Sequence, residues 1–323
     1  MSFNFSNKPL VSIACIAYNQ SNYIQEALDG FLMQKTNFPI EIIIHDDAST
    51  DGTAEIIRKY EEKFPDIIKP IYQVENQYTK GEGIMIPFVY PKCNGKYIAL
   101  CEGDDYWTDP YKLQKQVDFL EVNEEYGLVH TNYKVVGQNQ NSVFKYKRGL
   151  LSGDMFEKIL KYQYNIVTAT VLFRTSVYKS IECEYSKMKF QMGDLPLWLT
   201  LSHVSKFKYL EDVTTTYRVL CNSVSHPDDI EKLISFRLNT VAIRQYFSSK
   251  YNVEFNKKNA LSCVYAQIIK DAYIKKNNLI AVQYYIKMIR ANLLSLFNPV
   301  PLLFLLGTRF FLVNKLICYL YKF

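Results

Sequence analysis

The sequence predicts an α/β fold in which a mostly parallel sheet is flanked by helices and followed by a helical C-terminal extension. In the first half of the chain, short apolar segments alternate with helical patterns at intervals of roughly 30 residues, as in βαβ units. From Asp228 onward the pattern is helical only. With 323 residues, 48% of them hydrophobic, the chain is long enough to bury a full core.

Buried strands are predicted wherever a short apolar run is bounded by turn residues. They are Val11–Ala17, Ile40–His45, Ile67–Val74, Tyr97–Cys101 and Gly127–Tyr133. The helices between them are expected to end near Met33, Phe64 and Val122. Ser21 or Asn22 is expected to cap the first, and Asp109 the third, with Pro110 at its first helical position.

The second half of the chain has a looser pattern. Alternating apolar residues predict a strand over Asn165–Phe173, and Gly193-Asp194-Leu195-Pro196 predicts the start of a helix to Val204. Further expected elements are strands at Phe207–Leu210 and Val213–Val219 and helices at Ile230–Phe247, Asn259–Ile274 and Leu279–Phe297. We therefore expect one domain over residues 1–225 and a helical region over residues 226–323.

The positive charge is concentrated at the C-terminus. The chain has 38 basic and 32 acidic residues, a net charge of +6, yet Ala272–Phe323 contains seven bases and no acid. A basic, apolar tail favours an anionic membrane surface over nucleic acid. Pro299–Val313 is too short to span a bilayer, so two alternatives stay open, in-plane membrane association and packing on the domain.

The seven cysteines are scattered singly, without a CxxC pair. This distribution is typical of a protein of the reducing cytoplasm and not of a disulfide scaffold. The N-terminal residues are polar, and we expect no signal peptide.

Polar residues follow three of the predicted strands, at Tyr18-Asn19, Asp46-Asp47 and Asp104-Asp105. In parallel sheets, ligands bind at the carboxyl ends of the strands, so these residues are expected to converge. Two adjacent acids are electrostatically costly unless a cation holds them, which indicates a metal site. The alternative is an acidic turn that caps the next helix.

Several other sites are excluded by spacing. Asp47–Gly52 begins like a calcium loop, but its twelfth position is Arg58 where a bidentate Glu is required. A phosphate-accepting Asp47 would need a second acid at Ser49. The sequence also contains no Walker A or GxGxxG motif.

Three motifs in order resemble the family 2 glycosyltransferases. They are Val11-Ser12-Ile13 through Ala17-Tyr18-Asn19, His45 through Thr53, and Glu102-Gly103-Asp104-Asp105. The likeness extends over roughly the first 220 residues. It implies the GT-A fold, a Rossmann-like nucleotide-diphospho-sugar domain.

The resemblance also implies roles for individual residues. Ala17, Tyr18 and Asn19 match a nucleotide-binding segment, in which Tyr18 holds the base together with Asp47. Asp104 matches the first acid of the family's DXD-type motif, close to the ribose and diphosphate.

Asp105 matches the metal-ligating acid of that motif, with Mg²⁺ or Mn²⁺ as its ion. Tyr217-Arg218-Val219 resembles the segment that closes the site near the phosphates. Asp194 matches the catalytic base of inverting members, although an Asp at that point can also simply cap a helix. Departures are Ile16 for a frequent Pro, Ala48 for a frequent Gly and Leu220 for a frequent His, which His226 is a candidate to replace.

The resemblance implies an inverting, metal-dependent transferase of a single sugar. The donor would be a nucleotide-diphospho-sugar, most simply a UDP-sugar, and the acceptor a glycan or lipid-linked hydroxyl of surface polysaccharide or glycolipid synthesis. Thr168, Thr170 and Arg174 could line the acceptor side or belong to a half-buried strand. A non-catalytic nucleotide-sugar-binding or scaffold protein on the same fold is the alternative.

Overall fold

The structure is a computed structural model that describes residues 8–81, 83–137, 140–144, 152–161, 166–185, 187–188, 190–220, 223, 227–292 and 299–307. The chain divides into two compact units. The first contains Met1–Phe156, Tyr164–Lys189 and Pro196–Arg218, and the second contains Glu157–Gln163, Phe190–Leu195 and Val219–Phe323. Each unit is described by itself below.

Four parallel strands form one half of the sheet in the first unit. In sheet order they are β3 (Ile68–Tyr72), β2 (Ile40–Asp46), β1 (Val11–Ala17) and β4 (Tyr97–Glu102). Most of their residues are buried, since helices cover both faces of such a sheet. The βαβ organisation expected from the sequence is confirmed.

The other half of the sheet is largely antiparallel. β8 (Leu172–Arg174) pairs antiparallel with β4, and β6 (Tyr126–Gly137) pairs antiparallel with β8. The order continues through β9 (Lys206–Val219) to β5 (Tyr106–Trp107), while β7 (Gln140–Val143) lies beside β6. A single long β9 replaces the two short strands that we expected, because its far end pairs with β5.

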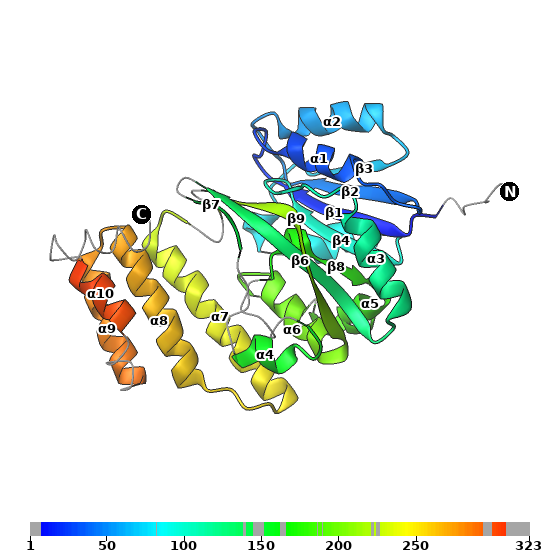
Figure 1. Cartoon of the computed structure of the whole chain (residues 1–323). Helices are drawn as coiled ribbons and strands as arrows, with labels where there is room; N and C mark the ends of the chain where they lie inside the picture. Colours follow the sequence, from blue (N-terminus) through cyan, green and yellow to red (C-terminus); the bar gives the residue numbers. More distant parts are fainter. Residues whose placement is uncertain are drawn as a thin grey trace. The chain divides into compact units, whose positions relative to one another are not determined.

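Helices pack on this sheet around one hydrophobic core. They are α1 (Ile24–Leu32), α2 (Thr53–Lys63) and α3 (Lys112–Val122). α5 (Thr175–Tyr185) contacts β8, and short helical turns lie at Tyr78–Lys80, Met85–Val89 and Tyr90–Lys92. α1 and α2 lie side by side against the parallel strands (Figure 1). α4 (Phe156–Lys161) and α6 (Asp194–Val204) both cross the boundary between the units.

The strand expected over Asn165–Phe173 is wrong for most of its described length. Thr168–Thr170 form a 3-10 turn, and the strand contains only Leu172–Arg174. The turn is closed by the Thr170 hydroxyl, which donates to the carbonyl of Val167 at 2.7 Å. Competition of this kind between side chain and sheet is usual for threonine.

Two expected helix caps are also wrong. The N-cap of α1 is Tyr23, without a side-chain cap, and the backbone of Ser21 instead donates to Asp51. The N-cap of α3 is Tyr111, so Asp109 closes a turn two residues before that cap by accepting from the Tyr111 amide at 2.8 Å.

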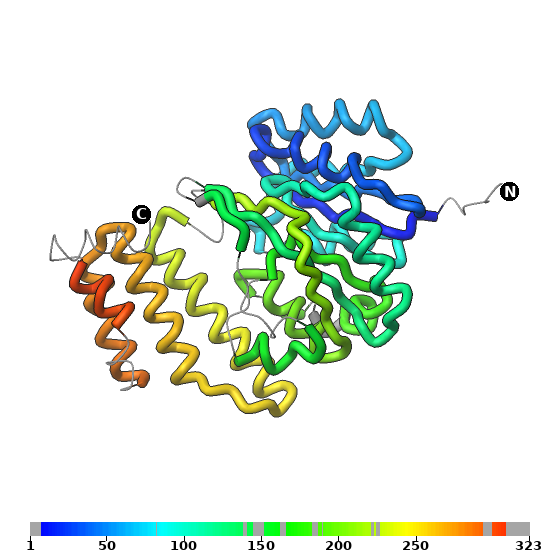
Figure 2. The backbone as a smooth tube through the Cα atoms, viewed as in Figure 1, coloured from blue at the N-terminus to red at the C-terminus, as the bar shows by residue number. Residues whose placement is uncertain are grey.

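The second unit is helical and has a core of its own. It contains α7 (Ile230–Tyr251), α8 (Lys257–Ile274), α9 (Asn278–Ala291) and α10 (Pro299–Gly307). Asp229, Asn256 and Asn277 cap the first three helices through their side chains. Figure 2 traces these helices from yellow to red. Among the described helices, none combines the length and the apolar character needed to cross a bilayer.

Candidate functional site

The carboxyl ends of three strands meet at one edge of the sheet. β1 lies between β2 and β4, and the register pairs Ala17 with Asp46 and Ile16 with Glu102. The convergence that the sequence predicted is therefore confirmed. Two polar turns and one acidic turn follow these strand ends.

The turn after β1 is joined to the turn after β2. The amide of Asp47 donates to the carbonyl of Ala17 at 3.0 Å, and the amide of Asn19 donates to the hydroxyl of Ser49 at 2.9 Å. Asn19 adopts a left-handed conformation with φ of 51°, which asparagine tolerates better than most residues. Tyr18 lies between these contacts and is 48% exposed, so its ring is accessible to a ligand.

Asp47 is fully buried and anchors a third segment. Its Oδ1 accepts from the amide of Gln77 at 2.7 Å, and its Oδ2 accepts from the amide of Tyr78 at 3.0 Å. The side chain of Asn76 donates to the Asp47 carbonyl at 3.2 Å. These contacts add residues 76–78 to the edge of the site. The loop over residues 75–95 was expected to shape donor and acceptor choice, but its contacts with Asp47 could not be predicted from the sequence. The predicted contact of Asp47 with a nucleotide base stays a prediction.

The acidic turn, which contains Gly103, Asp104 and Asp105, packs against the end of β1. The amide of Gly103 donates to the carbonyl of Ile16 at 2.9 Å. A Cβ atom at Gly103 would lie 2.5 Å from Oε1 of Gln20 and 2.7 Å from Cδ1 of Ile24. The absence of a side chain at Gly103 thus lets Gln20 and Ile24 pack closely against this turn.

Asp105 is 2% exposed, and its Oδ1 accepts from the backbone amide of Arg218 at 2.8 Å. Burial, together with the charges of Asp104 and Glu102, raises the pKa of its carboxyl group well above the usual value. Burial also raises the pKa of Asp104, which is partly exposed. The acidic pair is thus short of positive charge.

Arg218 connects the acidic turn to α1. Its Nη1 donates to the backbone carbonyl of Asp104 and its Nη2 to Oε1 of Glu26, both at 2.6 Å. The guanidinium carbon lies 4.3 Å from the ring centroid of Tyr106 and 5.1 Å from that of Tyr23, within the range of cation–π contacts. The structure therefore places Asp104 and Arg218 in one cluster. Glu26, which the sequence did not indicate, belongs to the same cluster.

A divalent cation fits the acidic turn. Asp104 and Asp105 supply hard carboxylate oxygens, which Mg²⁺ and Mn²⁺ prefer, and their raised pKa values show that a positive charge would stabilise them. Within the described residues, no group of three or more His, Cys, Asp or Glu side chains forms a metal cage. That is compatible with Mg²⁺, which is commonly held by one or two carboxylates plus substrate phosphates.

Asp194 belongs to the second unit, where it is the first residue of α6 and is exposed. Its Oδ1 accepts from the amide of Leu195 at 2.7 Å. This contact satisfies one free N–H at the start of the helix, as expected for a residue at a helix N-terminus. The role of Asp194 as a catalytic base stays a prediction.

The other residues that the sequence suggested either make contacts that stabilise the fold or lie outside the described residues. Arg174 donates from Nε to the carbonyl of Tyr126 at 2.8 Å and from Nη2 to the carbonyl of Asn123 at 3.2 Å, so it closes the C-terminal end of α3. Thr170 is fully buried within its turn. His226 lies outside the described residues.

The chain is similar to proteins of several bacteria. It is 50% identical over 115 residues to an uncharacterized protein of Mycobacterium tuberculosis, covering 36% of this chain and 32% of that relative. It is 34% identical over 218 residues to UDP-Glc:alpha-D-GlcNAc-diphosphoundecaprenol beta-1,3-glucosyltransferase WfaP of Escherichia coli, covering 67% of this chain and 80% of that enzyme. The chain thus spans about a third of the length of its mycobacterial relatives.

The fold is also similar to a solved structure, that of S. aureus TarS 1–349 in complex with UDP-GlcNAc. The TM-score is 0.54 at 16% identity, covering 87% of this chain and 88% of the other. At this identity the likeness concerns the fold alone, and it confirms the expected GT-A architecture.

The sequence model of glycosyl transferase family 2 matches residues 12–182, more than half of the chain. This segment contains the ends of β1, β2 and β4 and the acidic turn. The chain belongs to glycosyl transferase family 2.

Proposed function

We propose that this protein is an inverting, metal-dependent glycosyltransferase that moves a single sugar from a nucleotide-diphospho-sugar to a hydroxyl acceptor. The observation that carries the proposal is the acidic turn, where Asp104 and Asp105 lie at the edge formed by the ends of β1, β2 and β4. Keeping a buried carboxylate next to a second, partly exposed one is costly, and a divalent cation would offset that cost.

The donor and acceptor are proposed from the relatives. WfaP is named for a UDP-Glc donor and a diphosphoundecaprenol-linked acceptor, and the TarS structure contains UDP-GlcNAc. We therefore propose a UDP-sugar as donor and a glycan or lipid-linked hydroxyl as acceptor, in the synthesis of a surface polysaccharide or glycolipid. Tyr18 and Asp47 would hold the base of the nucleotide, and Ala17 and Asn19 would belong to the same nucleotide-binding turn.

In this proposal the chain's own residues bind the donor and move one proton. Asp105, oriented by the amide of Arg218, would hold Mg²⁺ or Mn²⁺, and the carboxylate of Asp104 would lie beside it near the ribose and diphosphate of the donor. The ion supplies charge stabilisation for the diphosphate that leaves. Asp194 would accept the proton of the acceptor hydroxyl as its oxygen bonds to the sugar carbon and the bond from that carbon to the diphosphate breaks. A single displacement of this kind inverts the configuration at the carbon.

A panel of nucleotide-sugars with Mn²⁺ or Mg²⁺ tests the proposal, by donor binding and slow donor hydrolysis. We expect one UDP-sugar to bind and to be hydrolysed slowly in the absence of acceptor. No response to any donor would contradict the proposal and favour a non-catalytic scaffold protein.

The base is tested by Asp194→Asn. We expect transfer to fall by about two or more orders of magnitude, as for loss of a general base, while donor affinity is retained. Normal transfer by the variant would contradict the assignment of Asp194. Ser202→Ala, a change in the body of α6, is the matched control and should keep normal transfer.

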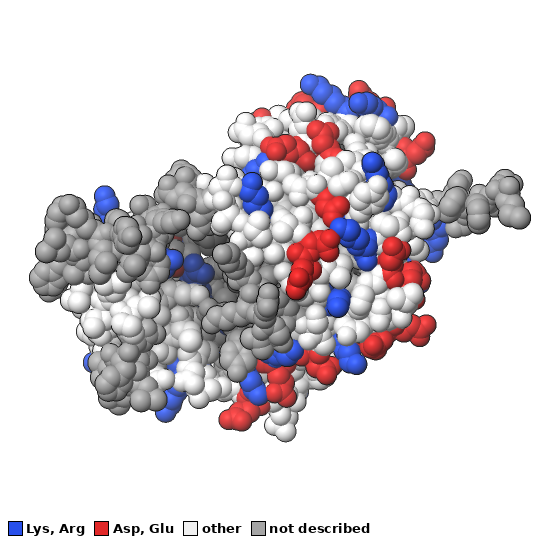
Figure 3. All heavy atoms as spheres, in the orientation of Figure 1, with Lys and Arg blue, Asp and Glu red and all other residues white. Residues whose placement is uncertain are grey.

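We further propose that residues 1–225 are the catalytic domain and that the helical region 226–323 contacts an anionic membrane surface. Acidic and basic side chains are interspersed on the face of the first unit that is in view (Figure 3), whereas residues 272–323 carry bases and no acid. In α10, Val300 is 43% and Leu306 37% exposed. Apolar side chains next to basic ones are typical of peripheral membrane contacts. The last part of this tail, residues 308–323, lies outside the described residues.

The membrane proposal is tested by fractionating cells that express the full chain or a chain ending at residue 298. We expect the full chain to sediment with membranes and the shortened chain to lose that association. Equal membrane fractions for the two chains would contradict it.

A further inference from the structure

The guanidinium of Arg218 lies beside the acidic pair, but its hydrogen bonds with described residues go to Glu26 and to a backbone carbonyl and not to the two carboxylates. It forms an ion pair with Glu26 on α1, and its contact with the acidic turn goes to the backbone carbonyl of Asp104. Among the described residues, Arg218 makes no ion pair with the carboxylate of Asp104 or Asp105. The Asp105 carboxylate instead receives the Arg218 backbone N–H.

This arrangement is unexpected on electrostatic grounds. An arginine beside two carboxylates would ordinarily form a bidentate pair with one of them. The surroundings of Arg218 oppose that, because the rings of Tyr23 and Tyr106 lie 5.1 and 4.3 Å from its guanidinium carbon. Glu26 then accepts from Nη2 at 2.6 Å. The Arg218 side chain is only 11% exposed, whereas that of Glu26 is 52% exposed.

We propose that Glu26 is a positioning residue that holds the guanidinium of Arg218 against α1 and so leaves the carboxylates of Asp104 and Asp105 to the divalent cation. The inference rests on the proposed function, in which Asp105 binds Mg²⁺ or Mn²⁺ and Asp104 lies beside it. Without Glu26, Nη2 of Arg218 loses its partner, and the guanidinium can pivot about its contact with the Asp104 carbonyl toward the acidic pair. It would then compete with the metal ion as an internal cation.

Binding of Mn²⁺ to the full chain without nucleotide tests the inference, by calorimetry or by the electron paramagnetic resonance of free Mn²⁺. We expect Glu26→Ala to weaken Mn²⁺ binding by about threefold to tenfold, in the lower part of the range of coupling energies between residues in contact. Glu26→Gln should lose less, because its amide oxygen can still accept from Nη2 of Arg218. Unchanged Mn²⁺ binding in both variants would overturn the inference.

A control variant separates this effect from the loss of any acid on the same helix. Asp29 also lies on α1, but its carboxylate accepts from the hydroxyl of Tyr60 at 2.5 Å. Asp29→Asn should therefore bind Mn²⁺ like the wild-type protein. If Asp29→Asn weakened binding as much as Glu26→Ala, the cause would be net charge, and the inference would fail.

A double-mutant cycle shows whether Glu26 acts through Arg218. In an Arg218→Met background, or Arg218→Gln if the methionine variant does not fold, Glu26→Ala should leave Mn²⁺ affinity unchanged. An equal loss in both backgrounds would mean that Glu26 attracts the ion directly, which overturns the inference. In transfer assays the apparent KM for Mn²⁺ should rise in Glu26→Ala, with kcat at saturating Mn²⁺ nearly unchanged.

The wild-type protein separates failure of the inference from failure of the proposed function. If it binds Mn²⁺ and Glu26→Ala binds equally well, the inference alone is wrong. If the wild-type protein binds no Mn²⁺ with or without UDP, the metal-dependent function is wrong and the inference falls with it.

Discussion

Ala48 has a left-handed backbone conformation, with φ of 61°. This conformation costs an L-residue roughly 1–2 kcal/mol and costs glycine little. The preference of related sequences for glycine at this point, which the resemblance implied, therefore has a local conformational reason. Alanine remains possible because the turns after β1 and β2 hold the backbone on both sides.

Ala48→Gly should stabilise the protein by about 0.5–1 kcal/mol, the strain that is relieved less the entropy that glycine loses on folding. Urea unfolding measures the change. Ala54→Gly in α2 is the matched control, since glycine inside a helix costs about 1 kcal/mol. A loss of stability in Ala48→Gly like that of the control would contradict the explanation.

Lys112 is a fully buried lysine in the core of the first unit. Its Nζ donates to Oε1 of Gln116 at 2.8 Å and lies 4.2 Å from the ring centroid of Trp107. Burial lowers the pKa of Lys112 to about 7 from the ordinary 10.5. Nearby Cys101 and Asp109 oppose this shift only in part.

The lowered pKa of Lys112 predicts a stability that depends on pH. Between pH 7 and about 10 the unfolded lysine keeps a proton that the folded one has lost, so the free energy of unfolding should rise with pH. The slope should approach about 1.4 kcal/mol per pH unit relative to Lys112→Met, which has no such group. Parallel pH profiles of the two proteins in urea unfolding would show that the buried lysine stays charged.

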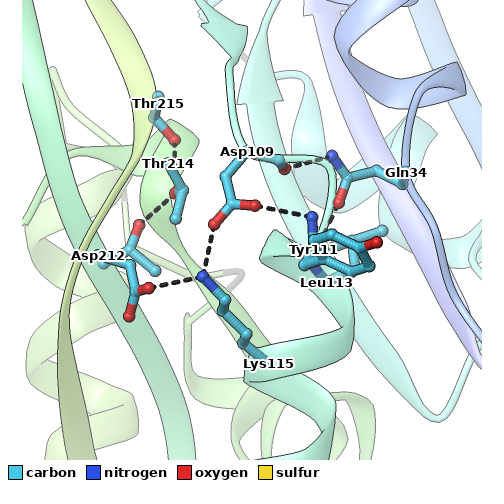
Figure 4. Close-up of polar contacts among 9 residues, drawn as sticks. Gln34, Asp109, Tyr111, Leu113, Lys115, Asp212, Thr214 and Thr215 are labelled. Carbon is cyan, nitrogen blue, oxygen red and sulfur yellow. Dashed lines mark hydrogen bonds and ion pairs between the residues drawn. The ribbon is translucent and has the colours of Figure 1, made fainter.

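At the level of secondary-structure elements, the start of α3 is held by contacts from β9 and from the segment after α1, both in the first unit (Figure 4). Asp109 accepts from the Tyr111 amide and from Nζ of Lys115, each at 2.8 Å. Lys115 also pairs with Asp212 on β9 at 2.6 Å. Gln34, after α1, donates to the carbonyl of Asp109 at 2.9 Å. This network fixes the direction in which the chain leaves the acidic turn.

The two acids of this network should differ in their effect on stability. Asp109→Ala should cost about 1–2 kcal/mol, because it removes both a turn-closing hydrogen bond and an ion pair. Asp212→Asn should cost less than about 0.5 kcal/mol, as expected of an exposed ion pair. Urea unfolding checks both values, and equal losses would contradict the turn-closing role of Asp109.

The elements differ in how far their sequence predicts them. Strands β1, β2 and β4 could be predicted because each is a continuous apolar run that is buried on both faces. The segment before β8 was misread because Ala169 through Phe173 are all buried, so the alternation of residue types there does not reflect one exposed face. β5 and β7 contain two and four residues, too few for a periodic pattern.

The acidic pair of the site could be predicted because it follows a strand that is itself easy to recognise in the sequence, whereas Glu26 could not. Asp104 and Asp105 follow a strand directly, so the rule that ligands bind at strand ends is enough to identify them. Glu26 gave no such signal, because in sequence it is an ordinary acid in the first turn of α1. Its partner Arg218 is 192 residues away, and only the path of β9 brings the two together.

At the scale of the whole molecule, the donor side of the proposed site lies within the first compact unit. Asp104, Asp105 and Arg218 belong to the first unit and Asp194 to the second. The proposed donor site is supported by contacts that the structure shows among these residues of the first unit. The assignment of Asp194 as the base depends only on the resemblance to the family motif. The central claim is therefore that the acidic turn binds the diphosphate of a nucleotide through a divalent cation.

Calorimetric binding of UDP with and without Mn²⁺, to the wild-type protein and to Asp105→Asn, tests this claim most directly. We expect Mn²⁺ to strengthen UDP binding to the wild-type protein by about tenfold or more, or about 1.4 kcal/mol. Asp105→Asn should lose this gain while it unfolds at a similar or higher temperature, because the substitution removes a buried charge. An equal gain from Mn²⁺ in both proteins, or no binding of UDP to the wild-type protein, would show that the acidic turn does not bind the nucleotide diphosphate through a cation.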